Sequence, residues 1–329
     1  MMHQYRFTRF ISALLISTTL ALSACSVNPV SGKKEFSLIS KEQEVAMGAQ
    51  GHQEIIKKTP PYNNRRLQAY VNSIGQQLAS KSHRNNIRYT FTVLDDPAVN
   101  AFALPGGYIY ITTGIMAYLN SEGELAGVLG HEIGHVTARH GVQQASAGTA
   151  ASILIDVVNK KWGGGNILNQ IGSVALSGYG RQHELQADRL GAEYLARVGY
   201  SPSNMIDVIS VLKSQEQFAG RSSSYHGVFA THPSNDQRLQ EVVGAAKRIS
   251  SAGSRPANHD GYLREINGLK FRISKGRYGR VVVGNVKTAG ITFETLAQQS
   301  AVDARRLRLL NGKYPNGQPK VGTLVKIIK

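Results

Sequence analysis

The spacing of apolar residues predicts a mostly helical chain with a few short strands near its middle. Apolar positions recur every three or four residues, the period of a buried helix face, in eight segments at 40–58, 63–81, 121–140, 143–158, 166–177, 181–198, 203–218 and 234–250. Alternation of apolar and polar residues predicts three strands, at 87–93, 100–104 and 108–112. Together these elements indicate an α+β domain, mostly helical with a small β-sheet.

The composition changes after a linker at 250–260, which is rich in Ser, Gly, Pro and Asn. The segment 264–329 carries 14 Lys and Arg against 3 Asp and Glu, so its net charge of +11 is most of the +17 of the whole chain. Its periodicity predicts strand, helix, helix and strand over 281–328. We therefore expect two domains, the first at 25–255 and a linker with a small basic βααβ module at 256–329.

The basic module resembles a LysM domain. The resemblance lies in the Gly290-x-Thr292 turn, the helix that follows it and the closing strand that begins after Gly322. It implies that residues 264–329 bind peptidoglycan, although Ile291 stands where LysM domains usually carry an aspartate. A small basic module that contacts anionic lipid or the cell wall without specificity is the alternative.

The first 24 residues have the pattern of a signal peptide. Two arginines precede an apolar run of 13 residues at 10–22, which is too short to cross a membrane. The run leads through Leu-Ser-Ala to Cys25, a sequence that resembles the bacterial lipobox. The resemblance implies a lipid anchor on Cys25, and Ser26 after it implies sorting to the inner face of the outer membrane. A plain secretory signal followed by an incidental cysteine is the alternative.

The overall composition excludes several classes of protein. Hydrophobic residues make up 41% of the chain, the balance of a folded protein and not of a disordered one. A single cysteine excludes an intramolecular disulfide and a zinc site built from cysteines. The charge of +17 favours an anionic partner, and we expect no nucleic acid among the partners.

The candidate chemistry begins with an H-E-x-x-H motif that runs from His131 through Glu132 to His135. Residues four apart lie on one face of a helix, so the two imidazoles can share one tetrahedral Zn²⁺ per chain. Glu132 lies one step round the helix, where its carboxylate can take the proton of a metal-bound water and pass it to the leaving amine. The motif predicts metal-dependent hydrolysis.

A catalytic zinc site needs a third protein ligand, for which Glu184 is the candidate. Glu184 and Asp188 are also four residues apart on a predicted helix. In this arrangement Glu184 ligates the metal, while Asp188 accepts a proton from a ligand imidazole and fixes its tautomer. A solvated acidic helix face is the alternative for such a pair.

Several motifs in this order resemble the HtpX-like metallopeptidase family, which includes the CAAX prenyl endopeptidases. They are Asn28–Gly32, Val99–Gly107, His131–His140 (HEIGHVTARH), Glu184-x-x-x-Asp188 and Thr231-His232-Pro233. The similarity covers about residues 26–250 and is greatest to the periplasmic lipoprotein branch of the LoiP and BepA type. It implies a zincin fold of the gluzincin type and supports Glu184 as the third ligand.

The same resemblance implies further roles. Asn100 and the strand beside it would pair with an extended peptide substrate. His232 would stabilise the oxyanion of the reaction or fill the open metal position in a latent state, and Arg238 would bind substrate in the same cleft. By themselves, Asn100 is typical of a turn and His232 of a helix start before proline.

The sequence therefore predicts a zinc-dependent endopeptidase that is lipid-anchored in the bacterial periplasm. Its expected substrates are unfolded or misassembled envelope proteins, which makes envelope quality control its expected role. Two other classes stay open. One is a chaperone-like assembly factor whose metal site is latent, and the other is a peptidoglycan endopeptidase that the LysM-like module directs to the wall.

Overall fold

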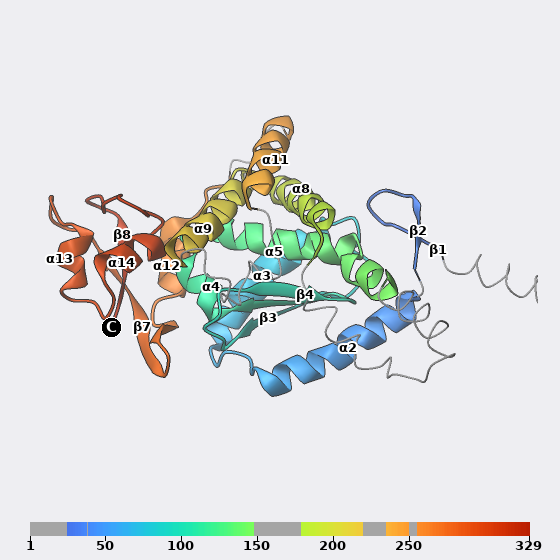
Figure 1. Cartoon of the computed structure of the whole chain (residues 1–329), viewed down its shortest axis with the longest axis horizontal. Coiled ribbons are helices and arrows are strands. Elements are labelled where there is room, and N and C mark those ends of the chain that lie inside the picture. The colour runs from blue at the N-terminus through green and yellow to red at the C-terminus, as the bar shows by residue number, and fades with distance from the viewer. Residues whose placement is uncertain (1–24, 38, 148–178, 220–234, 250–254) are drawn as a thin grey trace, which may run out of the picture.

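The computed structural model describes residues 25–37, 39–147, 179–219, 235–249 and 255–329 (Figure 1). Its helices are α2 (Lys41–Lys58), α3 (Arg65–Ser80), α4 (Thr113–Tyr118), α5 (Glu122–Thr137), α8 (Arg181–Arg197), α9 (Asn204–Ala219), α11 (Asn235–Arg248), α12 (His259–Glu265), α13 (Phe293–Ala297) and α14 (Ala304–Leu310). Its strands are β1 (Cys25–Val27), β2 (Lys34–Phe36), β3 (Thr90–Leu94), β4 (Ala101–Leu104), β5 (Tyr108–Thr112), β6 (Lys270–Ser274), β7 (Arg277–Asn285) and β8 (Leu324–Ile328). The predicted α+β class is confirmed.

Most of the elements expected from periodicity are present within a few residues of their predicted bounds. The expected helices at 143–158 and 166–177 lie largely or wholly outside the described residues. In the described part of the chain, no helix is both long and apolar enough to cross a membrane. The signal peptide predicted at 1–24 also lies outside the described residues.

The central sheet has the strand order β3-β5-β4, with β3 and β5 parallel and β4 antiparallel to β5. Helices α3 and α5 pack on one face, where their apolar side chains form the main core with the sheet. Helix α2 runs along the opposite face, where Ile55 packs on Leu94, Leu104 and Tyr110 (Figure 1). Among the described strands, β4 lies at an edge of the sheet and packs against α5.

Helix α5 is buried along its whole length, and its first turn is held by hydrogen bonds. The Ser121 hydroxyl caps the helix by accepting from the amide of Glu124 at 3.0 Å. The Glu122 carboxylate accepts from Tyr70 at 3.0 Å and from Arg255 at 2.8 Å. Asn258 also donates to it, at 2.9 Å. These contacts fix the start of α5 against α3 and the segment that follows α11.

The end of α5 is held by a buried group of three charges. Glu44 of α2 accepts from Arg84 at 2.5 and 2.9 Å and from Arg139 at 2.9 Å. All three side chains are at most 6% exposed. Arg139 lies just past the helix with a φ of 58°, a left-handed conformation that reverses the chain there. We call Glu44, Arg84 and Arg139 the charge triad.

Helices α5 and α8 approach closely because small residues line their contact. A Cβ atom added at Gly134 would lie 2.9 Å from the carbonyl oxygen of Ala187. One added at Gly191 would lie 3.0 Å from the amide nitrogen of His131. Only the hydrogen of a glycine fits at such distances, since ordinary carbon contacts begin near ~3.5 Å. The close approach brings the carboxylates of α8 to the histidines of α5.

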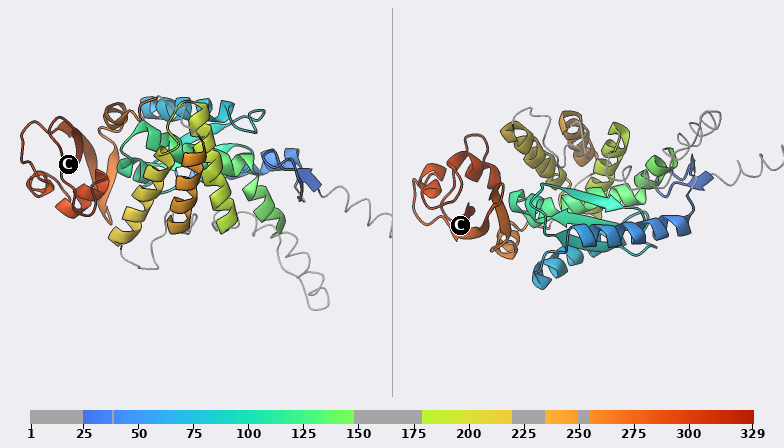
Figure 2. Two further views of the ribbon diagram at one scale, coloured as in Figure 1. Left: turned by 90° about the horizontal axis from the view of Figure 1, so that it is seen from above. Right: turned by 60° about the horizontal axis from the view of Figure 1, so that its bottom comes forward.

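The C-terminal module is a three-stranded antiparallel sheet, β6-β7-β8, with α13 and α14. It lies at one end of the molecule, far from β1 and β2 (Figures 1 and 2). The order β7, α13, α14, β8 matches the predicted βααβ pattern, whereas β6 was not expected. The likeness to a LysM domain stays a prediction.

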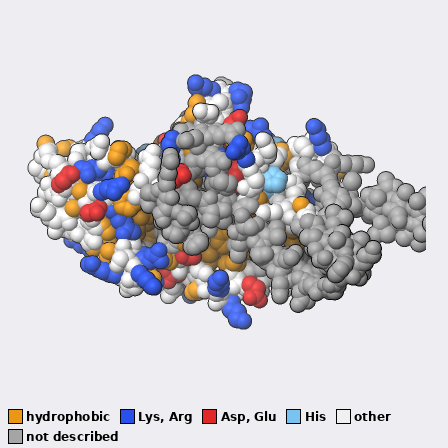
Figure 3. All heavy atoms as spheres, in the orientation of Figure 1, with side chains coloured by type: hydrophobic (Ala, Val, Ile, Leu, Met, Phe, Trp, Pro, Cys, Tyr) orange, Lys and Arg blue, Asp and Glu red, His pale blue; other side chains and the backbone are white. Residues whose placement is uncertain are grey.

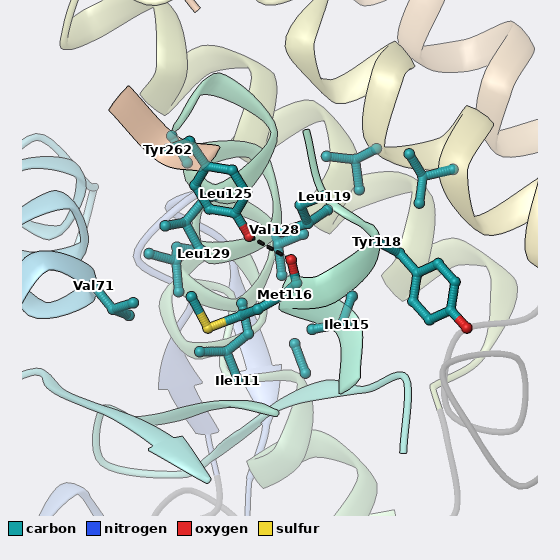
Figure 4. Close-up of a cluster of buried hydrophobic side chains, with 14 of the residues drawn as sticks. Val71, Ile111, Ile115, Met116, Tyr118, Leu119, Leu125, Val128, Leu129 and Tyr262 are labelled. Carbon is teal, nitrogen blue, oxygen red and sulfur yellow. Dashed lines mark hydrogen bonds between the residues drawn. The ribbon is translucent and has the colours of Figure 1, made fainter. Parts of the chain in front are cut away.

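Buried polar contacts join this module and α12 to the first domain. The Tyr262 hydroxyl donates to the carbonyl oxygen of Met116 at 2.6 Å (Figure 4). The Lys326 ammonium, which is fully buried, donates to the carbonyl oxygens of Ala117 and Leu119 at 2.9 and 2.7 Å. Burial lowers the pKa of Lys326 to about 7, while the charge of Glu124 opposes that shift. Apolar residues of the module, such as Phe271 and Leu307, also belong to the same buried cluster as the core of the first domain.

Candidate metal centre

Three side chains from two helices converge on one point. His131 and His135 come from α5, and their Nε2 atoms are 2.9 Å apart. The carboxylate of Glu184, on α8, lies 3.5 Å from His131 Nε2 and 3.4 Å from His135 Nε2. One ligand atom from each residue lies within 4.8 Å of the others, and all three residues are buried.

This donor set fits a zinc ion. Zinc prefers imidazole nitrogen and carboxylate oxygen in tetrahedral geometry, with bonds near ~2.0–2.1 Å that separate ligands by about 3.3 Å. The three distances observed are close to that separation. Two histidines, one glutamate and an open fourth position are the arrangement of catalytic zinc sites. The residues predicted from the sequence as ligands thus lie together and could hold a metal.

Asp188 and Arg238 stand behind the first histidine. The Nδ1 of His131 is 2.8 Å from Asp188 Oδ1, so an Nδ1–H donated to this carboxylate leaves Nε2 to face the metal. Arg238 donates to both oxygens of Asp188 at 2.7 Å, and its third nitrogen is 3.3 Å from Glu184. The structure thus places Arg238 on the two carboxylates, and a direct contact with substrate stays a prediction.

The charges of this group perturb one another. Burial would lower the pKa of His131, but the carboxylates of Asp188 and Glu184 raise it to about 9. Burial would raise the pKa of Asp188, but Arg238 and His131 lower it. Asp188 is therefore ionised at neutral pH. His131 is protonated there, so a metal ion that binds its Nε2 must displace a proton from the imidazole.

A chain of two hydrogen bonds supports His135. It runs through His140, whose role was not evident from the sequence. His135 Nδ1 is 2.9 Å from His140 Nδ1, and His140 Nε2 is 2.9 Å from Gln186 Oε1. Burial and His183 lower the pKa of His140 to about 3, so its ring is neutral. Because Nε2 of His140 donates to Gln186, its Nδ1 accepts from His135. The free lone pair of His135 is then on Nε2, toward the metal.

Two further features shape the site. The ring of Tyr179 stacks on His135, with centroids 3.9 Å apart. Glu132 is 2% exposed and lines a narrow cavity with His131, Arg238 and Ala101 of β4. Tyr179 and Gln186 could not be found from the sequence, because neither belongs to a spaced motif.

The edge strand β4 runs beside the metal-binding helix. Ala101 reaches the cavity at Glu132, and its neighbours Ala103 and Leu104 line a second cavity with His135. Asn100 directly precedes β4, where its amide nitrogen and carbonyl oxygen bond with Thr112. Of the other predicted site residues, His232 and the side chain of Cys25 lie outside what the structure describes.

The fold and the site together define a metallopeptidase of the zincin class. Comparison with known proteins places it further: residues 65–246 match the model of peptidase family M48, and the chain belongs to that family.

Three individual relatives share between 24% and 28% sequence identity with the chain. The chain is 28% identical to the beta-barrel assembly-enhancing protease of Escherichia coli K12 over 253 residues, 73% of this chain and 51% of that protein. It is 27% identical to the same-named protease of Yersinia pestis over 240 residues, 69% of this chain and 49% of that one. It is 24% identical to the mitochondrial metalloendopeptidase OMA1 of Schizosaccharomyces pombe over 225 residues, 65% and 64% of the two chains. The chain thus spans about half the length of the bacterial relatives.

Proposed function

We propose that this protein is a zinc-dependent endopeptidase of the bacterial envelope that cleaves unfolded or misassembled envelope proteins. The observation that carries the peptidase assignment is the ligand triangle of His131, His135 and Glu184, with Glu132 beside it and each histidine held by its own partner. Membership of peptidase family M48 supports the same reaction. The envelope role is supported by the name of the bacterial relatives.

Zn²⁺ held by the three ligands would supply a strong nucleophile near neutral pH and polarise the peptide carbonyl. Glu132, buried next to His131, takes the proton of the nucleophile and delivers it to the amine that leaves. The substrate backbone pairs with the edge of β4, which runs along α5 and sets the cleaved bond over Glu132. His232 completes this proposal as the group that stabilises the developing oxyanion.

The proposed location is the periplasm, with an acyl anchor on Cys25 at the inner face of the outer membrane. The sequence around Cys25 supports this location. Such an anchor would leave the peptidase site free to meet envelope proteins before they assemble.

Digestion of a denatured outer-membrane protein tests the proposal. The purified protein should cleave it, a chelator should stop cleavage, and added zinc should restore it. Glu132→Gln is the matched variant, because glutamine keeps the shape and cannot accept the proton. It should retain zinc and lose a factor of about 10² to 10⁴ in rate. Undiminished cleavage by this variant would reject the mechanism, and release of muropeptides without protein cleavage would reject the substrate class.

A further inference from the structure

The β6–β7 hairpin carries an unusual concentration of positive charge. Residues 270–280 hold five cations and no acid: Lys270, Arg272, Lys275, Arg277 and Arg280. No Asp or Glu occurs anywhere between Glu265 and Glu294. Lysine and arginine side chains are frequent on the surface at the left and lower left of Figure 3, the end of the molecule where the module lies. We call residues 270–280 the basic hairpin.

Two of the five cations are engaged within the protein. Lys270 lies opposite Arg280 in the β-ladder and reaches Asp95 at 3.1 Å, while Arg280 donates to the carbonyl oxygen of Gly268. The side chains of Arg272, Lys275 and Arg277 are exposed and make no ion pair within the described residues. Only Lys270 and Arg280 face each other directly as like charges in the ladder, a pairing that costs stability. The three exposed cations are left to interact with groups outside this part of the fold.

The hairpin is also held rigid and carries an exposed aromatic ring. Arg306 of α14 donates to the carbonyl oxygens of Ile273 and Arg272 at 2.5 and 2.9 Å, which fixes β6 from behind. Tyr278, opposite Arg272 in the ladder, is 47% exposed. The backbone that carries the exposed cations is thus fixed, and Tyr278 lies among them with the Lys270 ammonium over its ring at 4.9 Å.

From this arrangement we infer that the basic hairpin binds the surface of an anionic phospholipid membrane. Phosphate headgroups attract clusters of lysine and arginine, and a tyrosine with an apolar ring and a polar tip suits the headgroup layer. A glycan would instead need a groove lined by hydrogen-bonding groups, and the described cavity of the module opens elsewhere, between α12 and the segment 311–325. This contact does not depend on the peptidase function.

Vesicle binding tests the inference. All proteins carry Cys25→Ser, so that no acyl chain contributes. The parent should sediment with vesicles of phosphatidylcholine and phosphatidylglycerol, and not with phosphatidylcholine alone. Each lysine or arginine near such a surface contributes about fivefold in affinity, so Arg272→Gln/Lys275→Gln/Arg277→Gln should bind on the order of 100-fold more weakly. Binding by the parent should also fall as salt rises from ~0.1 to ~1 M.

The matched control removes three exposed cations of α2 with Lys41→Gln/Lys57→Gln/Lys58→Gln. It has the same net charge as the hairpin variant and should bind like the parent. Equal losses in the two variants would show a response to net charge alone and overturn the inference. So would a hairpin variant that still binds anionic vesicles fully, or one that loses binding to purified sacculi while vesicle binding is unchanged. Circular dichroism and zinc content should be the same for all three proteins.

Discussion

Replacing Gly134 with alanine should weaken the metal site without touching a ligand. A Cβ atom at this position would lie 2.9 Å from the carbonyl oxygen and 3.0 Å from the Cα of Ala187. Both are backbone atoms and cannot move alone, so α8 must retreat by about 0.5 Å to restore ordinary contact. Ala187 lies between Glu184 and Asp188 on α8, so both carboxylates move with it.

That displacement exceeds the tolerance of about 0.2 Å in metal–ligand distances. We expect zinc affinity to fall on the order of 10- to 100-fold, the range found when the partners that orient a ligand are lost. Competition with a chromophoric chelator measures this affinity directly. The expected loss is notable because alanine is intrinsically better than glycine in a helix by about 1 kcal/mol, so a mutation that favours α5 would impair the site.

Gly127→Ala is the control within the same helix. Its Cβ atom would lie 2.9 Å from a methyl group of Val208, which belongs to α9 and not to the helix of the third ligand. This variant should keep parental zinc affinity even if its stability changes. Unchanged zinc affinity in Gly134→Ala, with the fold intact by circular dichroism, would refute the claim that close helix packing sets the ligand geometry.

Three further substitutions probe the site and its support. Glu184→Ala should lose most bound zinc by metal analysis, and full occupancy would place the third ligand elsewhere. Asp188→Asn should bind zinc about 10- to 100-fold more weakly. It should also cost about 3–5 kcal/mol in urea unfolding, because buried Arg238 loses the nearer of its two counter-charges, with only Glu184 left at 3.3 Å. A loss of zinc with unchanged unfolding would contradict this. Lys326→Ala should lower the free energy of unfolding by about 2–4 kcal/mol, since two carbonyls lose their donor and a cavity forms. Zinc affinity should not change, and a stability equal to that of the parent would show that the module is not held by this residue.

The fold was predictable where periodicity is long and regular. Helices such as α3 and α8 bury one face over four turns, and their bounds follow from the sequence within a few residues. Strand β6 (Lys270–Ser274) was missed although Phe271 and Ile273 alternate with polar residues, because so short a run directly after a helix does not by itself distinguish a strand from a loop. Short elements depend on the partner they pair with, which the local sequence does not contain.

The candidate site divides in the same way. Ligands on one helix face, such as His131 and His135, can be recognised from their spacing alone. The spacing of Glu184 and Asp188 also indicates a shared face, but it is equally typical of a solvated acidic helix. The role of His140 was not visible, because it depends on the left-handed turn at Arg139 that brings the chain back against His135. Contacts that form only when distant segments meet leave no periodic trace in a sequence.

The charge triad has a consequence for how the protein opens. With Glu44 joining α2 to the end of α5, and Glu122 holding its beginning, the metal-binding helix has no frayed terminus. Amide hydrogens of α5 should then exchange with solvent only when the whole domain unfolds, more slowly than those of the exposed α2. The histidines would then already be in their ligating positions in the metal-free protein. Metal binding would take place at this preformed site, without refolding of the chain.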